Sequence, residues 1–428
     1  MSQRDPLSDQ PPVLPPIKRV LVTGVTGYVG GRLVPRLLES GYLVRVLVRG
    51  DAGRLAGREW MDQVEVALGD VLEPASLIAA LKDVDAAYYL IHSMTDSSEF
   101  SSRDQQAAQN FAQAAAANGV QRIIYLGGLG QSDAELSLHL RSRHETGAAL
   151  RTAGVPVTEF RAAIIVGSGS ISFEMIRNLT ERVPVMVCPR WVYTRVQPIA
   201  IRDVLAYLIA ALAVPASADR IVEIGGRDVL TYGEMMLRYA RVRGLWRWML
   251  PVPFLTPRLS SYWVHLVTPV TAKLARPLIE GLRNEVIVTD ECAQELFPSI
   301  EPLGYDLAVE LALDRLHEGR VETVWSDALM SSRGDLPPTL LVEEQGMLIE
   351  RRRLIVPLAA HYVYSSFASL GGARGWPPYD WLWRLRGLMD RMVGGVGVRR
   401  GRRHPTDLRV GDAVDFWRVE MVEPDHLL

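Results

Sequence analysis

The stretch Thr23-Gly24-Val25-Thr26-Gly27-Tyr28-Val29-Gly30 decides the fold of this chain. It follows an apolar run, residues 20–22, and it leads into Leu33 and Leu37, which have the spacing of one helix face. The order of strand, glycine turn and helix is typical of a loop that binds the phosphates of a dinucleotide. The sequence therefore predicts a nucleotide-binding site at this turn.

Each glycine of the turn has an expected task. Gly24 is expected to adopt backbone angles that other residues rarely take, and Gly27 lets the main chain approach a pyrophosphate. Gly30 lets the helix pack close to the strand, and the start of the helix offers free N–H groups to the phosphate charge.

Composition limits the remaining choices. The chain has 428 residues, is 48% hydrophobic and 22% charged, and has a formal net charge of −2, which gives no global attraction for nucleic acid or an anionic membrane. Cys188 and Cys292 lack metal-binding or redox spacing, so reduced thiols in a cytoplasmic protein are expected. Residues 1–16 are proline-rich without an apolar core, so they are predicted to form a disordered leader and not a signal peptide. The sequence has no run of about 18 apolar residues, so no transmembrane segment is predicted.

Short apolar runs alternate with amphipathic helical patterns in the first half of the chain. This alternation implies parallel strands joined by crossover helices, an α/β fold with a Rossmann-type doubly wound parallel sheet. Strands are expected at residues 19–22, 43–48, 64–68, 86–91, 122–126 and 157–160, and helices between them include residues 103–118 and 139–152.

The glycine spacing resembles that of the extended and atypical short-chain dehydrogenase/reductases. The three glycines form Gly-x-x-Gly-x-x-Gly, and Val44-Arg45-Val46-Leu47-Val48-Arg49 follows. The chain is similar to the NmrA-like group of NAD(P)-binding proteins over residues 17–325. The resemblance implies a nucleotide-binding Rossmann domain over residues 17–330, with a substrate-side helical cap at about residues 230–325.

Arg49 follows the second expected strand, where the adenosine ribose of a cofactor should lie. An arginine there accommodates the 2′-phosphate of NADP, whereas NAD-preferring sites place an acid there, and the nearest acid is Asp51. NADP is therefore expected, with NAD as the alternative. The resemblance adds Asp70 as a contact of the adenine amino group. The expected cofactor-binding residues are Gly24, Thr26, Gly27, Tyr28, Val29, Gly30, Arg49, Asp70, Val71, Leu90, Ile91 and His92.

The usual catalytic triad is absent. Active short-chain reductases use a Ser, a Tyr and a Lys four residues after the Tyr. Here the serine position falls in residues 126–129 and is glycine, while the Tyr and Lys positions fall on His139 and Arg143; no lysine lies between Lys82 and Lys273. Arg143 stays charged and is a candidate to hold the ribose hydroxyls. His139, with a pKa near neutrality, is a candidate acid or base, and a histidine on the helix surface is the alternative.

Arg161 ends the sixth expected strand and resembles a substrate-side position of the family, with pairing to an acid as the alternative. His144 and Glu145 follow His139 on the same expected helix, but no third ligand can be named, so no metal site is predicted.

Residues 245–277 are rich in tryptophan, leucine and proline, and the prolines exclude one long helix. A helical cap over the substrate is the favoured interpretation. The alternative is a hydrophobic-substrate role or a peripheral membrane contact through this segment.

A domain boundary is expected at residues 331–338, which end in two prolines. Strands are expected at residues 347–357, 362–370 and 414–422, and a helix at 380–393. Residues 339–428 resemble the uncharacterised domain appended to such reductase-like proteins, a smaller α+β domain of the START-like helix-grip type that looks truncated at Leu428. Its arginine cluster, residues 399–403, is predicted to be a solvated face, because nearby acids argue against nucleic-acid binding.

The sequence leaves three functions open. The resemblance favours an NADP-dependent oxidoreductase acting through a degenerate site on a small apolar carbonyl or quinone-like substrate, with the cofactor carrying the chemistry. The missing triad favours a non-catalytic NADP(H)-binding redox sensor or scaffold. A hydrophobic-ligand carrier that uses the C-terminal domain is the third.

Overall fold

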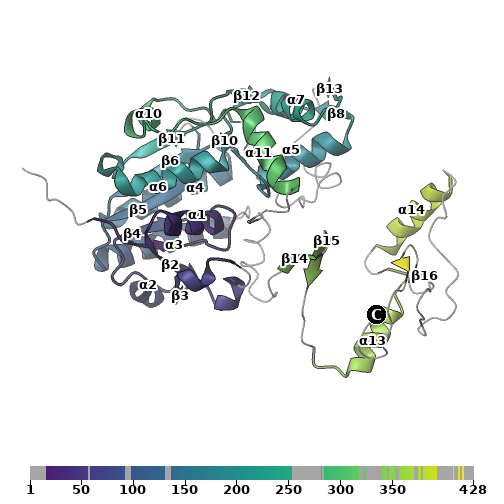
Figure 1. Ribbon diagram of the computed structural model, residues 1–428, viewed down its shortest axis with the longest axis horizontal. Helices are drawn as coiled ribbons and strands as arrows, with labels where there is room; N and C mark the ends of the chain where they lie inside the picture. Colours follow the sequence, from purple (N-terminus) through teal and green to yellow (C-terminus); the bar gives the residue numbers. More distant parts are fainter. Residues whose placement is uncertain are drawn as a thin grey trace, which may run out of the picture. The chain divides into compact units, whose positions relative to one another are not determined.

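Two compact units make up the chain, Met1–Arg352 and Arg353–Leu428. The computed structural model (Figure 1) describes residues 16–55, 58–91, 98–130, 136–252, 281, 284–317, 322–323, 340–344, 347–351, 356–370, 375–376, 379–392, 408, 413–414 and 417–418.

A seven-stranded parallel sheet forms the centre of the first unit. Its strand order is β11-β6-β5-β4-β1-β2-β3. The reversal of strand order between β1 and β4 is the switch point at which doubly wound sheets bind ligands. The predicted α/β fold is thus confirmed. The strands are β1 (Arg19–Val22), β2 (Leu43–Val48), β3 (Glu65–Leu68), β4 (Ala86–Tyr89), β5 (Arg122–Gly128), β6 (Val157–Ala162) and β11 (Ile221–Ile224).

Helices cover both faces of this sheet, which is why its central strands β1 and β4 are apolar on both faces. Val20 and Val22 of β1 belong to a core with α1 (Gly30–Glu39) and α6 (Ile201–Ala213). Leu21, on the opposite face, packs in a core with α2 (Pro74–Ala80), α3 (Ser98–Ala117) and α4 (Leu138–Leu150). Short 3-10 helices lie at Ala52–Leu55, Met61–Gln63, Arg151–Ala153, Arg190–Tyr193 and Pro215–Ser217.

A separate hydrophobic core lies beyond the sheet. It includes helices α7 and α11 from the predicted cap region, but also α5 and β8, which precede that region in sequence. Residues 253–280 of the predicted cap lie outside the described residues. The elements are α5 (Ile171–Arg182), α7 (Tyr232–Val242), α10 (Cys292–Leu296), α11 (Tyr305–His317), β7 (Ile165–Val166), β8 (Val185–Cys188), β9 (Arg195–Val196), β10 (Ile199–Ala200), β12 (Leu230–Thr231) and β13 (Trp248–Pro251).

The first unit also includes an antiparallel hairpin of β14 (Leu340–Glu344) and β15 (Met347–Arg351). In the second unit, α14 (Asp380–Met392) confirms the helix expected at residues 380–393. Two short antiparallel strands, β16 (Ala413–Val414) and β17 (Trp417–Arg418), lie where one strand was expected. The START-like type stays a prediction.

The strand expected at residues 362–370 is wrong, because α13 (Ala360–Ala368) is a helix. Tyrosine and valine favour strands, and they suggested one here. Ala368 and Tyr364, however, pack with Leu408 in a small core, and their spacing of four is that of a helix face. Among the described helices of both units, none has the length and hydropathy needed to cross a membrane.

Candidate functional site

The predicted cofactor residues gather at one edge of the sheet. Because the strands are parallel, their carboxyl ends share that edge. The glycine turn follows β1, Arg49 follows β2, Asp70 follows β3 and Leu90 follows β4. The sheet order places the turn at the switch point between β1 and β4.

The glycine turn is closed by contacts that exclude side chains. Gly24 has φ +67°, and a Cβ atom there would lie 2.6 Å from the carbonyl oxygen of Leu90. A Cβ atom on Gly30 would lie 2.3 Å from the carbonyl oxygen of Gly24. The N–H of Gly27 donates to the same carbonyl at 2.9 Å. The backbone conformation expected of Gly24 is therefore confirmed, and the close approach at Gly30 is to the main chain of the turn.

The start of α1 fits a bound phosphate. No side chain caps this helix, and no acid occurs in its first turn. A helix start of this kind suits an external anion such as a pyrophosphate.

Thr23, which the sequence analysis did not single out, joins the ends of β1 and β4. Its hydroxyl donates to the carbonyl oxygen of Tyr88 at 3.0 Å and accepts from the N–H of Leu90 at 3.0 Å. Val71 and Ile91 pack against the core that contains α3, so their side chains point into the protein. Both side chains are only partly buried, so their contact with a cofactor stays a prediction, and His92 lies outside the described residues.

Arg49 and Asp70 come together at the carboxyl ends of β2 and β3. The Nη1 atom of half-exposed Arg49 lies 4.0 Å from Oδ2 of Asp70. The other oxygen of Asp70 accepts from the N–H of Leu72 at 3.0 Å. The sequence analysis took Asp51 as the nearest acid, whereas the folded chain also places Asp70 beside Arg49. This carboxylate therefore lies within ion-pair range of the guanidinium at the end of the sheet.

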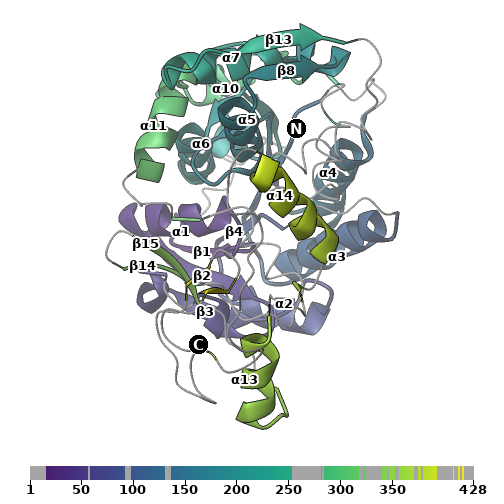
Figure 2. The same cartoon turned by 90° about the vertical axis from the view of Figure 1, so that its right-hand side faces the viewer.

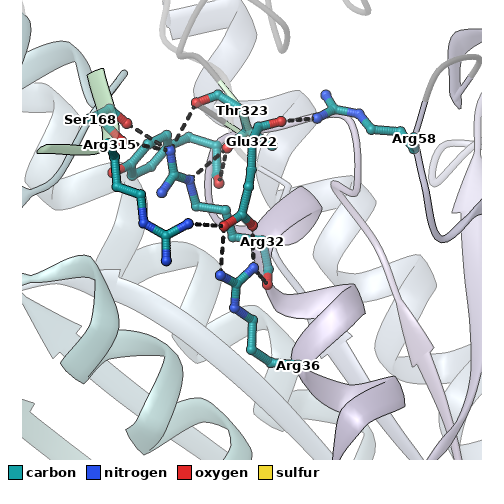
Figure 3. Close-up of polar contacts among 8 residues, drawn as sticks. Arg32, Arg36, Arg58, Ser168, Arg315, Glu322 and Thr323 are labelled. Carbon is teal, nitrogen blue, oxygen red and sulfur yellow. Dashed lines mark hydrogen bonds and ion pairs between the residues drawn. The ribbon is translucent and has the colours of Figure 1, made fainter. Parts of the chain in front are cut away.

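A set of polar contacts, here called the clamp, ties the glycine turn and α1 to Ser168, Glu322 and Thr323 (Figure 3). Arg32 on α1 donates from Nε to the hydroxyl of Thr323 at 2.9 Å, and Thr323 donates to the carbonyl oxygen of Tyr28 at 2.8 Å. Arg32 also donates from Nη2 to the carbonyl oxygen of Ser168 at 2.7 Å. A Cβ atom on Gly31 would lie 2.6 Å from the Thr323 methyl group, so only glycine admits this approach.

Glu322 completes the clamp. Its carboxylate accepts from both Nη atoms of Arg36, and its carbonyl oxygen accepts from Arg58. Bidentate arginine–carboxylate pairs are among the stronger contacts between side chains. The clamp therefore ties the chain after α11 to the helix that follows the glycine turn.

The side chain of Tyr28 points into the protein. Burial raises the pKa of its hydroxyl, which has no hydrogen-bond partner among the described residues. A Cβ atom on Gly167 would lie 2.4 Å from this hydroxyl, and the Arg32 guanidinium lies 4.6 Å from the Tyr28 ring centre. Tyr28 can thus meet a cofactor through its main chain.

Helix α4 packs closely across the end of β5. A Cβ atom on Gly128 would lie 2.8 Å from Cδ2 of Leu140 and 3.3 Å from Cδ of Arg143. Arg143 donates from Nη2 to the carbonyl oxygen of Leu126, and its buried Nε has no hydrogen-bond partner among the described residues. A serine at position 128 would therefore crowd the helix that carries both candidate catalytic residues.

His139 does not titrate near neutrality, which corrects the expectation from the sequence. Burial and the charge of Arg143 lower its pKa to about 4. Its side chain is partly buried and not on the open helix surface. At pH 7 it is a neutral imidazole, which offers one N–H donor and one acceptor nitrogen.

Arg161 pairs with an acid, as in the alternative interpretation. The fully buried Glu159 accepts from Nε of Arg161 at 2.7 Å and from Nη1 of Arg151 at 2.6 Å. Nε2 of His144 lies 3.1 Å from the carbonyl oxygen of Gly128. Within the described part of the chain, no group of three or more potential metal-ligating side chains occurs.

We expect the free energy of unfolding to fall between pH 7 and pH 4.5, and to fall less in His139→Phe. The ordinary histidine pKa is 6.5, whereas that of folded His139 is about 4. Below pH 6.5 the unfolded chain binds a proton that the folded chain does not, so stability is complete above pH 6.5 and is lost as the pH falls. The difference corresponds to about 2–3 kcal/mol at pH 4.5. Urea unfolding of both proteins at both pH values measures this fall in the free energy of unfolding. An equal fall in the wild type and in His139→Phe would contradict the lowered pKa of His139.

Comparison with known proteins agrees with this geometry. A family profile described as NAD(P)H-binding matches residues 24–161, and a protein family of unknown function, DUF2867, matches residues 348–428. A ceramide reductase of Caulobacter vibrioides is 31% identical over 231 residues, which cover 53% of this chain and 70% of the relative. A (4-alkanoyl-5-oxo-2,5-dihydrofuran-3-yl)methyl phosphate reductase of Streptomyces griseus is 30% identical over 233 residues, or 53% of this chain and 74% of the relative.

Solved structures share the fold at lower identity. The triphenylmethane reductase of Citrobacter sp. in complex with NADP(H) aligns with a TM-score of 0.55 and 19% identity, over 68% of this chain and 99% of that chain. An NADPH-dependent quinone oxidoreductase of Escherichia coli, in complex with NADPH, aligns with a TM-score of 0.56 and 17% identity. The alignment covers 68% of this chain and 98% of that chain.

Proposed function

The chain belongs to the NmrA-like group of atypical short-chain dehydrogenase/reductases, an NAD(P)H-binding family, and we propose that it is an NADPH-dependent reductase of an apolar carbonyl or quinone-like substrate. The observation that carries the proposal is the glycine turn, closed around Gly24 and Gly30 and followed by an uncapped helix start. This arrangement suits a pyrophosphate and leaves the nicotinamide end near β5 and α4.

The relatives support an apolar substrate. One is named a ceramide reductase, and the other acts on a molecule with an alkanoyl chain. A ceramide carries an acyl chain as well, so both names point to molecules with an apolar chain. We infer that the substrate of this chain also carries an extended apolar group.

When bound, NADPH would supply the hydride for the carbonyl carbon and would become NADP+. In this proposal, neutral His139 donates a hydrogen bond to the carbonyl oxygen, on which negative charge would develop. A proton from water completes the alcohol, because the lowered pKa of His139 leaves no imidazolium at neutral pH. Arg143 contributes a fixed positive charge near the same oxygen and the ribose.

A non-catalytic NADP(H)-binding sensor is the second candidate. The contact between Arg143 and the carbonyl oxygen of Leu126 favours it, because a guanidinium bound to main chain is less free to hold a ribose. An assay of NADPH oxidation with quinones, long-chain ketones and N-acylated amino ketones separates the two. Turnover of any of these by the wild type supports the reductase, and NADPH binding without turnover across the panel supports the sensor.

We expect NADPH to bind about 10- to 100-fold more tightly than NADH, because a charge-assisted contact between Arg49 and the 2′-phosphate is worth roughly 1.5–3 kcal/mol. Arg49→Ala should remove this preference and leave NADH binding nearly unchanged. Fluorescence titration with both cofactors measures the ratio.

Arg195→Ala is the matched control, since Arg195 is also an exposed arginine paired with an acid, Glu285. It lies in β9, beside Val196 of the second core and away from the carboxyl end of β2. This variant should keep the wild-type ratio. Equal dissociation constants for NADPH and NADH in the wild type would contradict the proposed NADPH preference.

A further inference from the structure

The ribbon formed by β8 and β13 is apolar on its outer face. The strands are parallel, with Trp248 paired to Val185 and Leu250 paired to Val187. All four side chains are exposed, whereas Met186 and Cys188 on the other face are buried in the second core. A sheet with one face toward solvent normally alternates apolar and polar residues, so an apolar outer face needs an explanation.

Two tryptophans are held outward at the edge of this ribbon. Trp246 is 77% exposed and Trp248 57%, and their rings meet edge to face with centres 5.1 Å apart. Arg247 between them points inward and donates to the carbonyl oxygens of Thr180 and Glu181 at the end of α5. The inward arginine fixes the segment, so the outward tryptophans are a built feature of the fold.

The surrounding sequence is basic although the whole chain has a net charge of −2. Residues 182–202 and 235–279 contain no aspartate or glutamate. Glu181, which precedes the first of these stretches, is already engaged by Arg243 and by the hydroxyl of Tyr239. The basic residues in the two stretches are Arg182, Arg190, Arg195, Arg202, Arg238, Arg241, Arg243, Arg247, Arg258, Lys273 and Arg276. Four of them, Arg195, Arg202, Arg238 and Arg243, form ion pairs with Glu285, Asp203, Asp228 and Glu181.

Exposed tryptophans beside arginines are the combination that binds the headgroup region of an anionic bilayer. Tryptophan places its ring at the boundary of headgroups and acyl chains, and each arginine near the surface adds an attraction to anionic lipid. In both views the ribbon lies at the outer edge of the first unit, beyond α5 and α7 (Figures 1 and 2). We propose that the β8–β13 ribbon, with Trp246 and Trp248, docks this protein on an anionic lipid surface.

A second copy of the chain fits this face less well. A twofold contact would bring the same surface of both copies together, and with it arginines against arginines. Like charges across an interface oppose association. A lipid surface supplies both the apolar layer and the negative charge. The docking proposal does not rest on the proposed reductase activity, because it concerns a surface outside the cofactor edge.

The test is sedimentation of the full chain with unilamellar vesicles, either of phosphatidylcholine alone or with about a third of phosphatidylglycerol. We expect binding to the mixed vesicles that weakens as salt is raised, accompanied by a blue shift of tryptophan fluorescence. The double variant Trp246→Ser/Trp248→Ser should bind about tenfold or more weakly, since it loses both apolar anchors. Leu43→Ser/Leu68→Ser removes two leucines that are each 56% exposed on β2 and β3, and should bind like the wild type.

A second pair of variants addresses the charges without altering the ribbon. Arg190 and Arg241 are exposed, and neither pairs with a carboxylate among the described residues. Replacing each by glutamine should weaken binding to the mixed vesicles about fivefold per arginine. This pair also tests the proposal if the tryptophan variant fails to fold, which circular dichroism reveals.

Three results would overturn the proposal. The first is a wild-type protein that stays in the supernatant with both kinds of vesicle, or that binds both equally. The second is unchanged binding in the folded tryptophan variant. The third is a wild-type dimer that the tryptophan variant converts to a monomer without any vesicle binding, which would assign the ribbon to a contact between copies.

Discussion

Gly27→Val will fold like the wild type but will show no thermal stabilisation by NADPH. Gly27 sits at the tip of the turn, where its N–H donates to the carbonyl oxygen of Gly24, and a valine side chain would occupy the space proposed for the pyrophosphate. At a cofactor concentration of 100 times its dissociation constant, the wild type gains about 2.7 kcal/mol of stability, and the variant should gain none. Thermal unfolding with and without NADPH measures both values.

The matched control is Gly119→Ala, at a glycine that closes α3 with φ +68° and has open space around a Cβ atom. It should lower the unfolding temperature through backbone strain and keep the full response to NADPH. Gly24 and Gly30 are poorer test positions, because side chains there collide with main-chain atoms and disturb the fold itself. A Gly27→Val protein that NADPH still stabilises would place the phosphate site elsewhere.

Local patterns in the sequence predicted most of the central fold. Strand β1, the glycine turn and α1 follow each other within about twenty residues, and the glycine spacing, apolar runs and helix periodicity all point to the same arrangement. Parallel strands then bring Arg49 and Asp70 to the edge that holds the glycine turn. Those features could be predicted because each depends on neighbours in the chain and on one rule of sheet topology.

The rest depends on contacts between distant residues. Arg32 meets Thr323 from 291 positions away, and no spacing or composition marks that pair. The pKa of His139 depends on how α4 is buried against β5, which a sequence motif does not contain. Helix α13 was mistaken for a strand because residue propensity outweighed a short helical spacing. The burial of Tyr28 likewise follows from its contact with Gly167, far along the chain.

If the protein is a reductase, His139→Phe should lower turnover by about 10²–10³, the effect of removing one donor to a developing oxyanion. The dissociation constant of NADPH should barely change, because the proposed partner of His139 is the substrate oxygen. Arg143→Ala should instead weaken NADPH binding, because its proposed partner is the ribose. Steady-state kinetics on any substrate found in the oxidation assay, together with cofactor titration, separates the two effects.

Two comparisons make the assignment of His139 specific. His144→Phe removes a histidine from the same helix whose Nε2 already contacts the carbonyl oxygen of Gly128, and it should retain most of the activity. The wild-type rate should also stay flat between about pH 5.5 and 8 as far as His139 is concerned, since its pKa of about 4 keeps it neutral throughout. Activity that survives His139→Phe, or that falls equally in both histidine variants, would show that the oxyanion is stabilised by another group. Turnover that rises as the pH falls through 6.5 and loses this dependence in His139→Phe would instead make His139 a proton donor with an ordinary pKa.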